Sequence, residues 1–575
     1  MIQLLTLTSP QKNIDLSKDF SIEYSIQNNI LKNEVSASLP IKLPLTANNR
    51  EIFGYINRID RLEYNEINIQ VLLVNNSYIK KANLVILSFE NNTFVGTLFF
   101  SFSNLLSIIN EDFIDEFEWD THKIEYNWGD FYSNEYKRDH LNNHPEKYAT
   151  PPIVTSTTFT ENPNRYGDDD YMPITTGLLI INAYNNFYRD PRVSNDISFL
   201  KLPVKDIANS NPSDLPFLEK AAYYTNREIT LNNENFSAIP FYFMSPFLKL
   251  RYVLEKLFNF YNYEFNYDDF TDYNSDFEYI ILLHNVIDVF RDDILDDKNL
   301  LPKISVKEFL NEIQKHFAGV FFIDEFAKKV KFTFYNDFFE NDIDIDLTQF
   351  LIKKYNVTNN LLGKQLILKN NYEQNSEATV TTNSESTKNA EEITFNFLNL
   401  ATIETPQRFY NLPHQLYVRT AIYKMIVMQE PLAAIISNPQ YPDWENLYPI
   451  KDKEKTSKVL LATYSGDVKT GQIIDTNNND QKTDWFRYTT SEKVFQNMAE
   501  TNMAAAEILY EKYKEYLGKN YITIECEMNI PLNILSNIAI EKPKLFLGQK
   551  CFIEEIKIQM TSEKTTQTII LQLTR

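Results

Sequence analysis

Hydrophobic and polar positions alternate along residues 35–44, near the start of the chain. The apolar positions of this segment are Val35, Ala37, Leu39, Ile41 and Leu43. A period of two predicts a β-strand with one buried face. Pro40 and Pro44 fall on the other face. Because proline has no N–H to donate, the strand is expected at the edge of a sheet.

More strands follow a polar turn that is predicted at residues 47–50, where Asn48 and Asn49 favour turn conformations. These strands are predicted at residues 52–59, 67–74, 84–89 and 93–102. Asn-Asn pairs at 75–76 and 91–92 separate the later ones. The pattern indicates a compact antiparallel β domain of about five strands.

The end of the chain shows the same kind of pattern. Strands are predicted at residues 521–528, 548–560 and 566–573, with a turn at 561–565 between the last two. Both ends of the chain are therefore expected to form small β domains, and the middle is expected to be an excursion between them.

The middle of the chain carries the helical signals. Ser245-Pro246 predicts a helix start, because serine caps helices and proline suits the first helical position; apolar residues at helical spacing follow up to Tyr261. Ser305 and Glu308 form a capping-box pattern before a second helix, and a hairpin is predicted at 320–334. A third helix is predicted at 491–517, with Gly518 as its stop.

The remaining middle segments are predicted to be less regular. Residues 119–236 are rich in proline, tyrosine and asparagine, which predicts a loop-rich β insertion. Residues 336–363 are acidic and are expected to be loop-like, and a strand is predicted at 364–371. Residues 373–392 are rich in Ser, Thr, Asn and Glu without an apolar period, which predicts a mobile loop. More strands are expected within 395–421.

Composition narrows the class of protein. A chain of 575 residues with 43% hydrophobic residues can form several folded domains. The formal net charge of -22 disfavours stable binding of nucleic acid over the whole surface, and an acidic wall would let DNA pass without sticking. No secretory leader pattern and no run of about 18 apolar residues is present, so no membrane span is expected.

Candidate chemistry is sparse. His140 and His144 have the spacing of a helical metal pair, with His122 as a conceivable third ligand, but Pro145 and the missing H-E-x-x-H pattern favour a surface loop. The acidic runs Asp168–Asp170 and Asp342–Asp346 could hold Ca²⁺ and are better explained as solvated loops. The aromatic run 258–261 could stack on sugars or bases, although core packing is favoured.

Phosphate-binding glycine loops and nucleophile elbows are absent from the sequence. Cys526 and Cys551 lie in predicted strands and are expected to be buried small hydrophobes, between which a disulfide is geometrically possible. The sequence therefore assigns no catalytic, cofactor-binding or metal residue, and an enzyme is not expected.

One segment resembles a known family. The run S-L-P-I-K-L-P-L-T-A-N-N-R-E-I-F-G-Y at residues 38–55, with the strands after it, resembles the N-terminal domain of tail hub (baseplate) proteins of tailed bacteriophages. The segment 304–324, and the order helix, loop, helix, hairpin around it, are similar to the helical α+β domain inserted in such hubs.

The resemblance implies an α+β, mainly β fold with two tube-like antiparallel β domains. The implied domains are an N-terminal tube-like β domain at 1–118, a loop-rich β insertion at 119–236, a helical α+β domain at 237–360, and a second tube-like β domain at 361–575 that includes a long loop and the helix 491–517. Three chains would then place six β domains in a ring at the tail tip, matching a sixfold tail tube to a threefold tip.

The implied role is structural, in the virion tail tip, for a protein made in the cytoplasm of the bacterial host. The implied partners are the tail tube or distal tail protein, the tape-measure protein, and a central spike or fibre with other baseplate proteins. DNA would pass transiently without specific binding. The alternatives are a hub or distal adaptor of a phage-like injection system and, in a different class, a glycan-binding surface β protein that uses residues 119–236.

Overall fold

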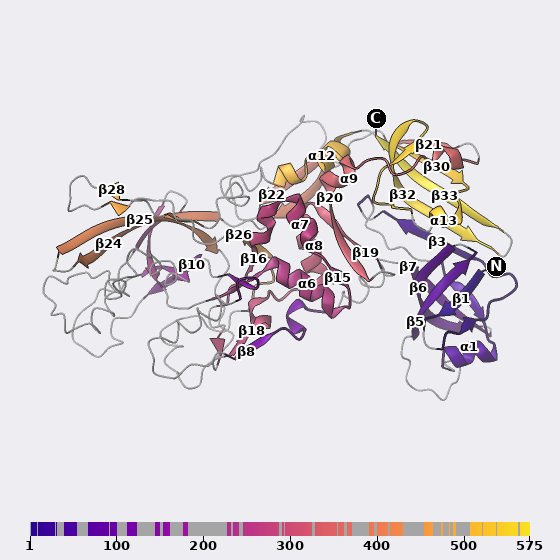
Figure 1. Cartoon of the computed structure of the whole chain (residues 1–575), viewed down its shortest axis with the longest axis horizontal. Helices are drawn as coiled ribbons and strands as arrows, with labels where there is room; N and C mark the ends of the chain where they lie inside the picture. The colour runs from indigo at the N-terminus through magenta and orange to yellow at the C-terminus, as the bar shows by residue number, and fades with distance from the viewer. Residues whose placement is uncertain are drawn as a thin grey trace.

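The structure is a computed structural model that describes the chain between residues 2 and 574 with gaps. The longest gaps are residues 55–66, 101–111, 124–143, 161–175, 182–226, 371–389, 429–453, 464–472 and 490–505. The fold is α+β and mainly β, with several antiparallel sheets. Figure 1 shows the two sheets from the chain ends side by side, the helices in the middle, and a further sheet beyond them.

The N-terminal sheet has six strands in the order β2-β1-β5-β6-β7-β4. Its elements are β1 (Ile2–Thr6), β2 (Asn13–Ile14), β4 (Ile41–Pro44), α1 (Ala47–Ile52), β5 (Ile67–Asn75), β6 (Tyr78–Glu90) and β7 (Thr93–Phe100). All its pairings are antiparallel. The predicted edge position is confirmed for Ile41–Pro44, because β4 ends the sheet. Residues 35–38 of the predicted strand lie outside the described residues, and Leu39, which was expected on the buried face, is 59% exposed. Asn76 and Asn92 lie at the predicted turns with φ of 54° and 61°.

The C-terminal sheet also has six strands, β21-β30-β33-β32-β3 with β31 beside β32. Its elements are β3 (Ile22–Gln27), β21 (Asn356–Asn360), β30 (Tyr521–Met528), α13 (Leu532–Leu535), β31 (Lys544–Phe546), β32 (Gln549–Met560) and β33 (Thr565–Thr574). The three strands predicted near the end of the chain are confirmed. β3 lies within the range 1–118 that was assigned to the N-terminal β domain, but it pairs with β32 instead.

The two terminal sheets share one hydrophobic core. Leu4, Leu73 and Leu84 of the N-terminal sheet belong to the same buried cluster as Ile556 and Ile569 of the C-terminal sheet. A hydrogen bond between the buried hydroxyls of Tyr24, in β3, and Tyr78, in β6, also links the sheets. The first and last parts of the chain therefore fold as one packed body.

A second core holds the helical body. Its elements are β14 (Phe247–Lys249), α6 (Leu250–Phe260), β15 (Glu264–Phe265), α7 (Asp268–Tyr273), β16 (Ile280–Leu283), α8 (Val306–Phe317), β19 (Gly319–Asp324), β20 (Lys329–Phe334), α9 (Tyr335–Glu340), β26 (Leu460–Thr463) and α12 (Glu511–Gly518). Phe270 lies at its centre, with ring contacts to Phe317, Phe332 and Phe334. The capping box at Ser305 and the hairpin β19–β20 are confirmed.

Short elements attach other segments to this body. They are η1 (Ile114–Glu116), β8 (Thr121–Lys123), β9 (Tyr148–Ala149), η5 (Ser275–Tyr279), β17 (Phe290–Arg291), β18 (Ile294–Asp296), η6 (Asp297–Leu300), η7 (Thr348–Phe350), β22 (Gln365–Asn370) and β23 (Ala390–Phe395). The strand predicted at 364–371 is confirmed as β22, which pairs in parallel with β23. Leu366, Leu368 and Phe395 complete the core of the helical body.

The remaining sheet has seven strands in the order β10-β11-β13-β12-β24-β25-β29. Its strands are β10 (Ile153–Thr160), β11 (Thr176–Ile181), β12 (Arg227–Leu231), β13 (Glu234–Pro240), β24 (Asn399–Asn411), β25 (Gln415–Met428) and β29 (Arg487–Thr489), and β27 (Ile473–Ile474) pairs separately with β28 (Lys482–Thr483). β12, from the range 119–236, pairs with β24, from the range 361–575. The division at residues 118, 236 and 360 stays a prediction, and this sheet draws on both sides of it.

Four local predictions are wrong. The strand predicted at 52–59 does not start at Ile52, which ends helix α1 with Phe53 as its C-cap; residues 55–59 lie outside the described residues. Residues 47–50 form helix α1 instead of a turn, because the Thr46 side chain accepts a hydrogen bond from Asn49 N–H and caps the helix. Ser245 does not start α6; its hydroxyl donates to the Val286 carbonyl, and the helix begins after Lys249. The segment 336–363 contains α9, η7 and β21 instead of being loop throughout.

Candidate functional site

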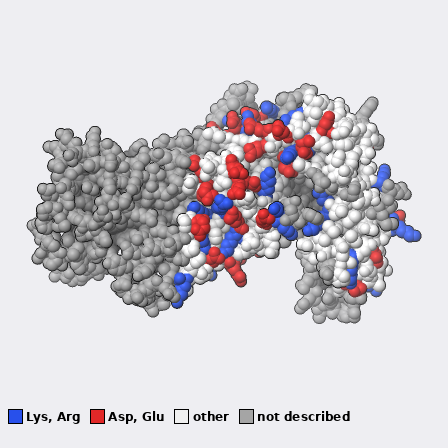
Figure 2. Space-filling view, viewed as in Figure 1, with Lys and Arg blue, Asp and Glu red and all other residues white. Residues whose placement is uncertain are grey.

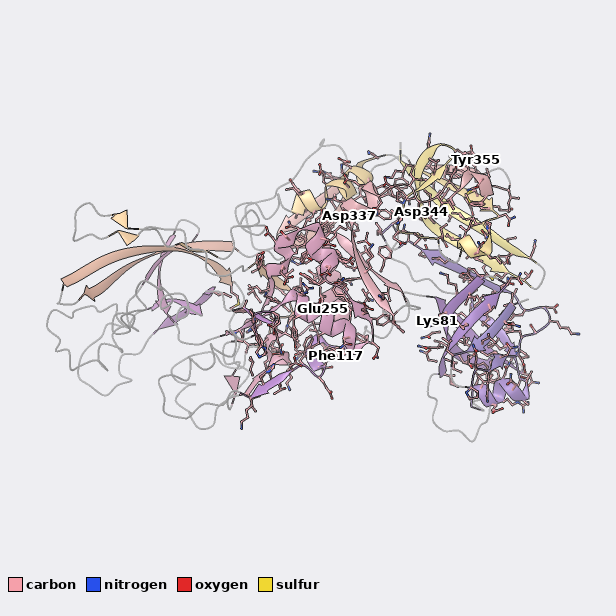
Figure 3. All side chains as sticks on the ribbon, viewed as in Figure 1. Lys81, Phe117, Glu255, Asp337, Asp344 and Tyr355 are labelled. Atoms are coloured by element: carbon pink, nitrogen blue, oxygen red, sulfur yellow. The ribbon has the colours of Figure 1, made fainter. Side chains whose placement is uncertain are left out.

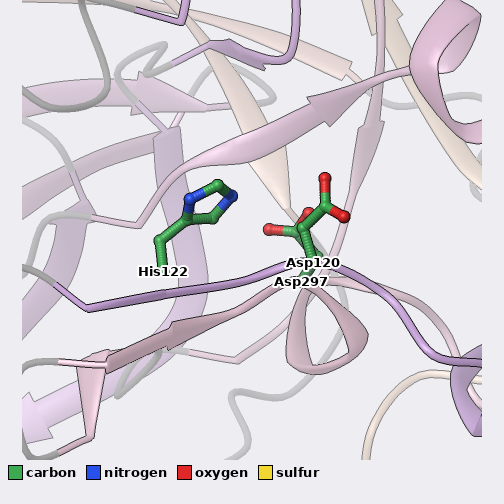
Figure 4. A group of neighbouring side chains, drawn as sticks. All are labelled: Asp120, His122 and Asp297. Carbon is green, nitrogen blue, oxygen red and sulfur yellow. The ribbon is translucent and has the colours of Figure 1, made fainter.

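A cluster of polar side chains surrounds the ammonium group of Lys147. Its Nζ lies 2.9 Å from Asp120 Oδ2, 2.5 Å from Asp297 Oδ2 and 2.8 Å from His122 Nε2. Figure 4 shows the two carboxylates and the imidazole ring converging. Asp120 directly precedes β8, and His122 lies within that strand. Asp297 begins η6, and Lys147 precedes β9. Three separate segments therefore meet at one point.

Helix α6 completes this cluster. Tyr252 and Lys256 lie four residues apart and so project from the same face of the helix. The Tyr252 hydroxyl lies 2.9 Å from Asp120 Oδ2 and 2.9 Å from Asp297 Oδ2, and Lys256 Nζ also donates to Asp120. We call the set Asp120, His122, Lys147, Tyr148, Tyr252, Lys256 and Asp297 the Lys147 cluster.

The electrostatics of the Lys147 cluster fix its charges. Partial burial acts to raise the pKa of Asp120, but hydrogen bonds from Lys256, Lys147 and Tyr252 outweigh it and hold that pKa well below its usual range. Burial and the positive charge of Lys147 lower the pKa of His122. Burial and the charge of Asp297 raise the pKa of Tyr148 and of Tyr252. At neutral pH Asp120 is therefore a carboxylate and His122 a neutral imidazole.

Ligand atoms of Asp120, His122 and Asp297 lie within 4.8 Å of one another, a spacing that a metal ion could bridge. However, Lys147 already contacts all three, so a chain ammonium occupies the place of a cation. The Tyr148 hydroxyl donates to Asp297 Oδ1 at 2.7 Å, which uses a further oxygen. The arrangement fits a partly buried ion network that holds four segments together better than it fits a metal centre or an acid–base pair.

The residues singled out in the sequence fall mostly elsewhere. His122 belongs to the Lys147 cluster. The centroid of the His144 ring lies 5.9 Å from the centroid of the His122 ring. His140 and Asp168–Asp170 lie outside the described residues. Asp344 forms an ion pair at 2.7 Å with the buried Lys544, and Asp346 accepts from Thr348 N–H, so both carboxylates serve the fold. In Figure 3, Asp344 and Tyr355 lie on the C-terminal sheet and Lys81 on the N-terminal sheet.

The cysteines and the aromatic run are confirmed as core residues. Cys526 and Cys551 are buried and free, and burial raises the pKa of each thiol to about 12, which keeps both protonated and unreactive. Phe258 is buried, and Phe260 stacks on Phe117 at 4.9 Å between ring centroids.

A second candidate is a repeated arrangement of strands in the two terminal sheets. The first β unit is β4–α1–β5–β6–β7, and the second β unit is β30–α13–β31–β32–β33. In each, a strand leads through a short helix into three more strands. The first strand pairs with the last, the second with the third, and the third with the last, all antiparallel. The spatial orders β5-β6-β7-β4 and β31-β32-β33-β30 therefore match.

Local details of the two β units also correspond. Two residues separate β5 from β6 and β31 from β32, and both connections pass through positive φ, at Asn76 and at Leu547-Gly548. The third strand of each unit carries a β-bulge, between Ile86 and Ser88 and between Ile553 and Glu555. These correspondences indicate an internal structural repeat.

A short sequence match could have revealed this repeat. The run I-K-L-P-L-T at residues 41–46 and the run M-N-I-P-L-N at 528–533 both carry apolar, polar, apolar, Pro, Leu and then a small polar residue, where a strand passes into a helix. The match is too short to stand out without the strand order.

The outer edges of the two β units differ. Pro44 of β4 has no N–H, and its carbonyl already accepts from Thr46 N–H and the Asn49 side chain, so proline and helix α1 block this edge. The corresponding strand β30 is covered by β21.

The chain matches no model of a known protein family and no curated protein. In the described part of the chain, no helix has both the length and the apolar character needed to cross a membrane.

Proposed function

We propose that this chain is a structural virion protein, the tail hub at the tip of a phage tail, and that three copies form a ring of six β units. The observation that carries the proposal is the internal repeat: two β units of the same topology, contributed by the two ends of one chain and joined by a shared core. A chain that holds two copies of one unit can give a threefold assembly six similar positions.

This arrangement solves a symmetry mismatch. A sixfold tail tube needs six similar docking surfaces, whereas a central spike or fibre needs three. The β units would face the tail tube or distal tail protein, and the tape-measure protein and then DNA would pass through the central channel. The helical body and the sheet that contains β24 and β25 would lie outward, where they can contact other baseplate proteins (Figure 1).

The described aromatic residues favour this role over glycan binding. Trp119, which opens the proline-rich insertion, is buried; its indole N–H donates to the Ile114 carbonyl at 2.7 Å, and its ring contacts Phe260. A glycan platform needs aromatic faces open to solvent. The side chains of the Lys147 cluster contact one another, which supports a structural role for this cluster.

The proposal is tested by locating the chain in purified virions. An antibody fragment against the N-terminal sheet, imaged by electron cryo-microscopy, should bind at the distal end of the tail with threefold symmetry. A chain that is absent from virions, or that binds the label along the tube or on the capsid, would contradict the proposal. A hub of a phage-like injection system would give the same label at the tip of a particle without a genome.

A further inference from the structure

One contact between the two β units within the chain joins a specific end of each unit. The β5–β6 hairpin tip of the first unit lies against the β32–β33 end of the second. The Asn75 side chain donates to Thr565 Oγ1 at 3.3 Å and lies 3.8 Å from Met560 Sδ. Asn75, Tyr78 and Met560 are buried there.

The internal repeat assigns an equivalent to each side of this contact. The strand pairing Asn75↔Tyr78 corresponds to Phe546↔Gln549, so the equivalent tip is the β31–β32 turn. The pairing Met560↔Thr565 corresponds to Glu90↔Thr93, so the equivalent receiving end is the β6–β7 turn. Within the chain, Leu547 N–H instead donates to Thr348 Oγ1, and the Asn92 carbonyl accepts from Leu45 N–H. Among the described residues no hydrogen bond joins these two turns.

Both equivalents are exposed. Leu547 is 46% exposed, and Gly548, Gln549, Glu90 and Asn92 are also at the surface. Leu547 has a φ of 49°, a conformation that bulky L residues rarely adopt. Asparagine or glycine would suit this turn better, so an apolar side chain is kept here at a conformational cost. Such a residue is expected where it contacts a partner.

We propose that the β31–β32 turn, led by Leu547, docks on the β6–β7 turn around Asn92 of a second copy of this chain. This inference rests on the proposed ring of six β units. Going round such a ring, two kinds of contact alternate. Within a chain, the hairpin tip of the first unit contacts the second unit; between chains, the corresponding tip of the second unit contacts the first unit of the next chain. The exposed turns are the surfaces that repeat the buried contact of Asn75 with Met560 and Thr565.

One test separates folding from association. Leu547→Asn places a residue that tolerates positive φ at the turn and removes the apolar contact. At a concentration at which both proteins are monomeric, the thermal unfolding temperature of the variant should equal or exceed that of the native chain. Its trimer should dissociate at concentrations at least about tenfold higher than the native trimer, measured by sedimentation. Ile79→Asn, an exposed apolar residue near the first hairpin tip, is the control for removing surface apolar area. Unchanged association of Leu547→Asn would overturn the contact.

A cross-linking experiment tests the contact directly. The full chain carrying Leu547→Cys and Asn92→Cys should form covalent trimers on oxidation, whereas each single variant should not; the native cysteines are buried. Asn75→Cys with Thr565→Cys should instead close a bond within one chain. A trimer that gives no cross-link between chains overturns this contact and leaves the hub in place. A chain that stays monomeric up to its solubility limit overturns the contact, while the virion label decides the hub.

Discussion

Single buried charges hold distant parts of this chain together. Lys147 and Asp297 are almost fully enclosed, with side chains 6% and 0% exposed. Lys544, which is also enclosed, is paired with Asp344 and donates to the Ala539 carbonyl. A buried charge needs its partner because the low-dielectric interior solvates it poorly. These residues are therefore expected to tolerate substitution badly although they have no part in chemistry.

Lys147→Met should destabilise the protein by about 3–5 kcal/mol, because it leaves the buried Asp297 carboxylate without its ammonium partner. The free energy of unfolding in urea measures the effect. The control is Lys298→Met, which removes a lysine that is 52% exposed and pairs with Asp296 at 3.0 Å; it should cost less than about 1 kcal/mol. Equal losses in both variants would show that the cluster is not an obligatory ion network.

The Lys147 cluster should not respond to divalent metal. Because the Lys147 ammonium contacts the three side chains that could be ligands, added Zn²⁺ or Ca²⁺ has to displace it. We expect no rise in the thermal unfolding temperature of the native chain on addition of metal and no fall on addition of chelator. Metal binding that is lost in His122→Gln would show that the cluster is a metal site.

His284 should make the protein acid-sensitive. Its Nε2–H donates to the Pro246 carbonyl at 2.8 Å, and its Nδ1 accepts from Val286 N–H at 3.2 Å, so both ring nitrogens are used by the neutral form. Burial lowers the pKa of His284 to about 4. Since the unfolded chain takes up the proton near pH 6.5, the stabilisation is complete above that pH and is lost as the pH falls towards 4, by ~3 kcal/mol.

Unfolding free energies between pH 7 and 4 measure this dependence. The His284→Gln variant should be less stable at pH 7 and should lose about one proton of pH dependence relative to the native chain. An unchanged pH profile in the variant would assign the acid sensitivity to other groups.

At the scale of elements, the period-two pattern predicted strands well and helix starts less well. The hairpin at 320–334 and the strands at 521–573 follow the sequence because alternating apolar residues decide which face is buried. The prediction for residues 47–50 was wrong because the same polar residues occur in turns and in helix caps. The hydrogen bond from Asn49 N–H to the Thr46 hydroxyl caps a helix here, and the sequence alone does not reveal it. Ser245 was misjudged because its hydroxyl has a tertiary partner at Val286.

The Lys147 cluster could not be predicted as a site. Its members come from four segments that are separated by long stretches of sequence, and none shows a local motif. Only His122 was singled out beforehand, as a conceivable partner of His140 and His144. The structure places His122 beside His144, whereas His140 lies outside the described residues. Sequence spacing reveals sites only when neighbours along the chain are neighbours in space.

The hairpin β19–β20 depends on a glycine. A Cβ at Gly319 would lie 2.5 Å from the Phe332 ring and 2.6 Å from the Thr333 carbonyl oxygen. Gly319→Ala should therefore push apart two strands at the core and cost about 1–3 kcal/mol. Gly518→Ala is the matched control, because nothing lies within 4 Å of its added Cβ. It should be neutral or stabilising by up to about 1 kcal/mol, as alanine favours the helix. Thermal unfolding of both variants measures the contrast, and a neutral Gly319→Ala would refute the close packing.

At the scale of the whole molecule, the two ends of the chain depend on each other. The sequence predicted β structure at both ends, but not that β3 would leave the N-terminal sheet to pair with Glu555–Met560 of β32. In the first β unit the long strand β5 pairs with most of β6. In the second, the short strand β31 pairs only with the start of β32, and β3 pairs with the remaining Glu555–Met560. Strand pairing over such a sequence distance has no local signal.

The net charge of the whole molecule predicts that it binds DNA weakly. The formal net charge is -22, and acidic residues gather over the helical body in Figure 2, with lysines and arginines dispersed among them. Neutralising phosphates and releasing their counterions drives nonspecific binding to DNA, and an acidic surface offers little of either. We therefore expect no binding of duplex DNA tighter than about 0.1 mM at physiological salt, which is the weak limit for proteins that bind DNA nonspecifically.

Fluorescence anisotropy of a labelled duplex, with a basic DNA-binding protein as the control in the same buffer, measures this directly. Binding that weakens steeply with salt would reveal a basic surface that contacts phosphates, and a basic channel wall would contradict the proposed acidic lining. Absence of binding fits a conduit better than a DNA-anchoring protein, because genome ejection requires that each phosphate leaves the wall as easily as it arrives.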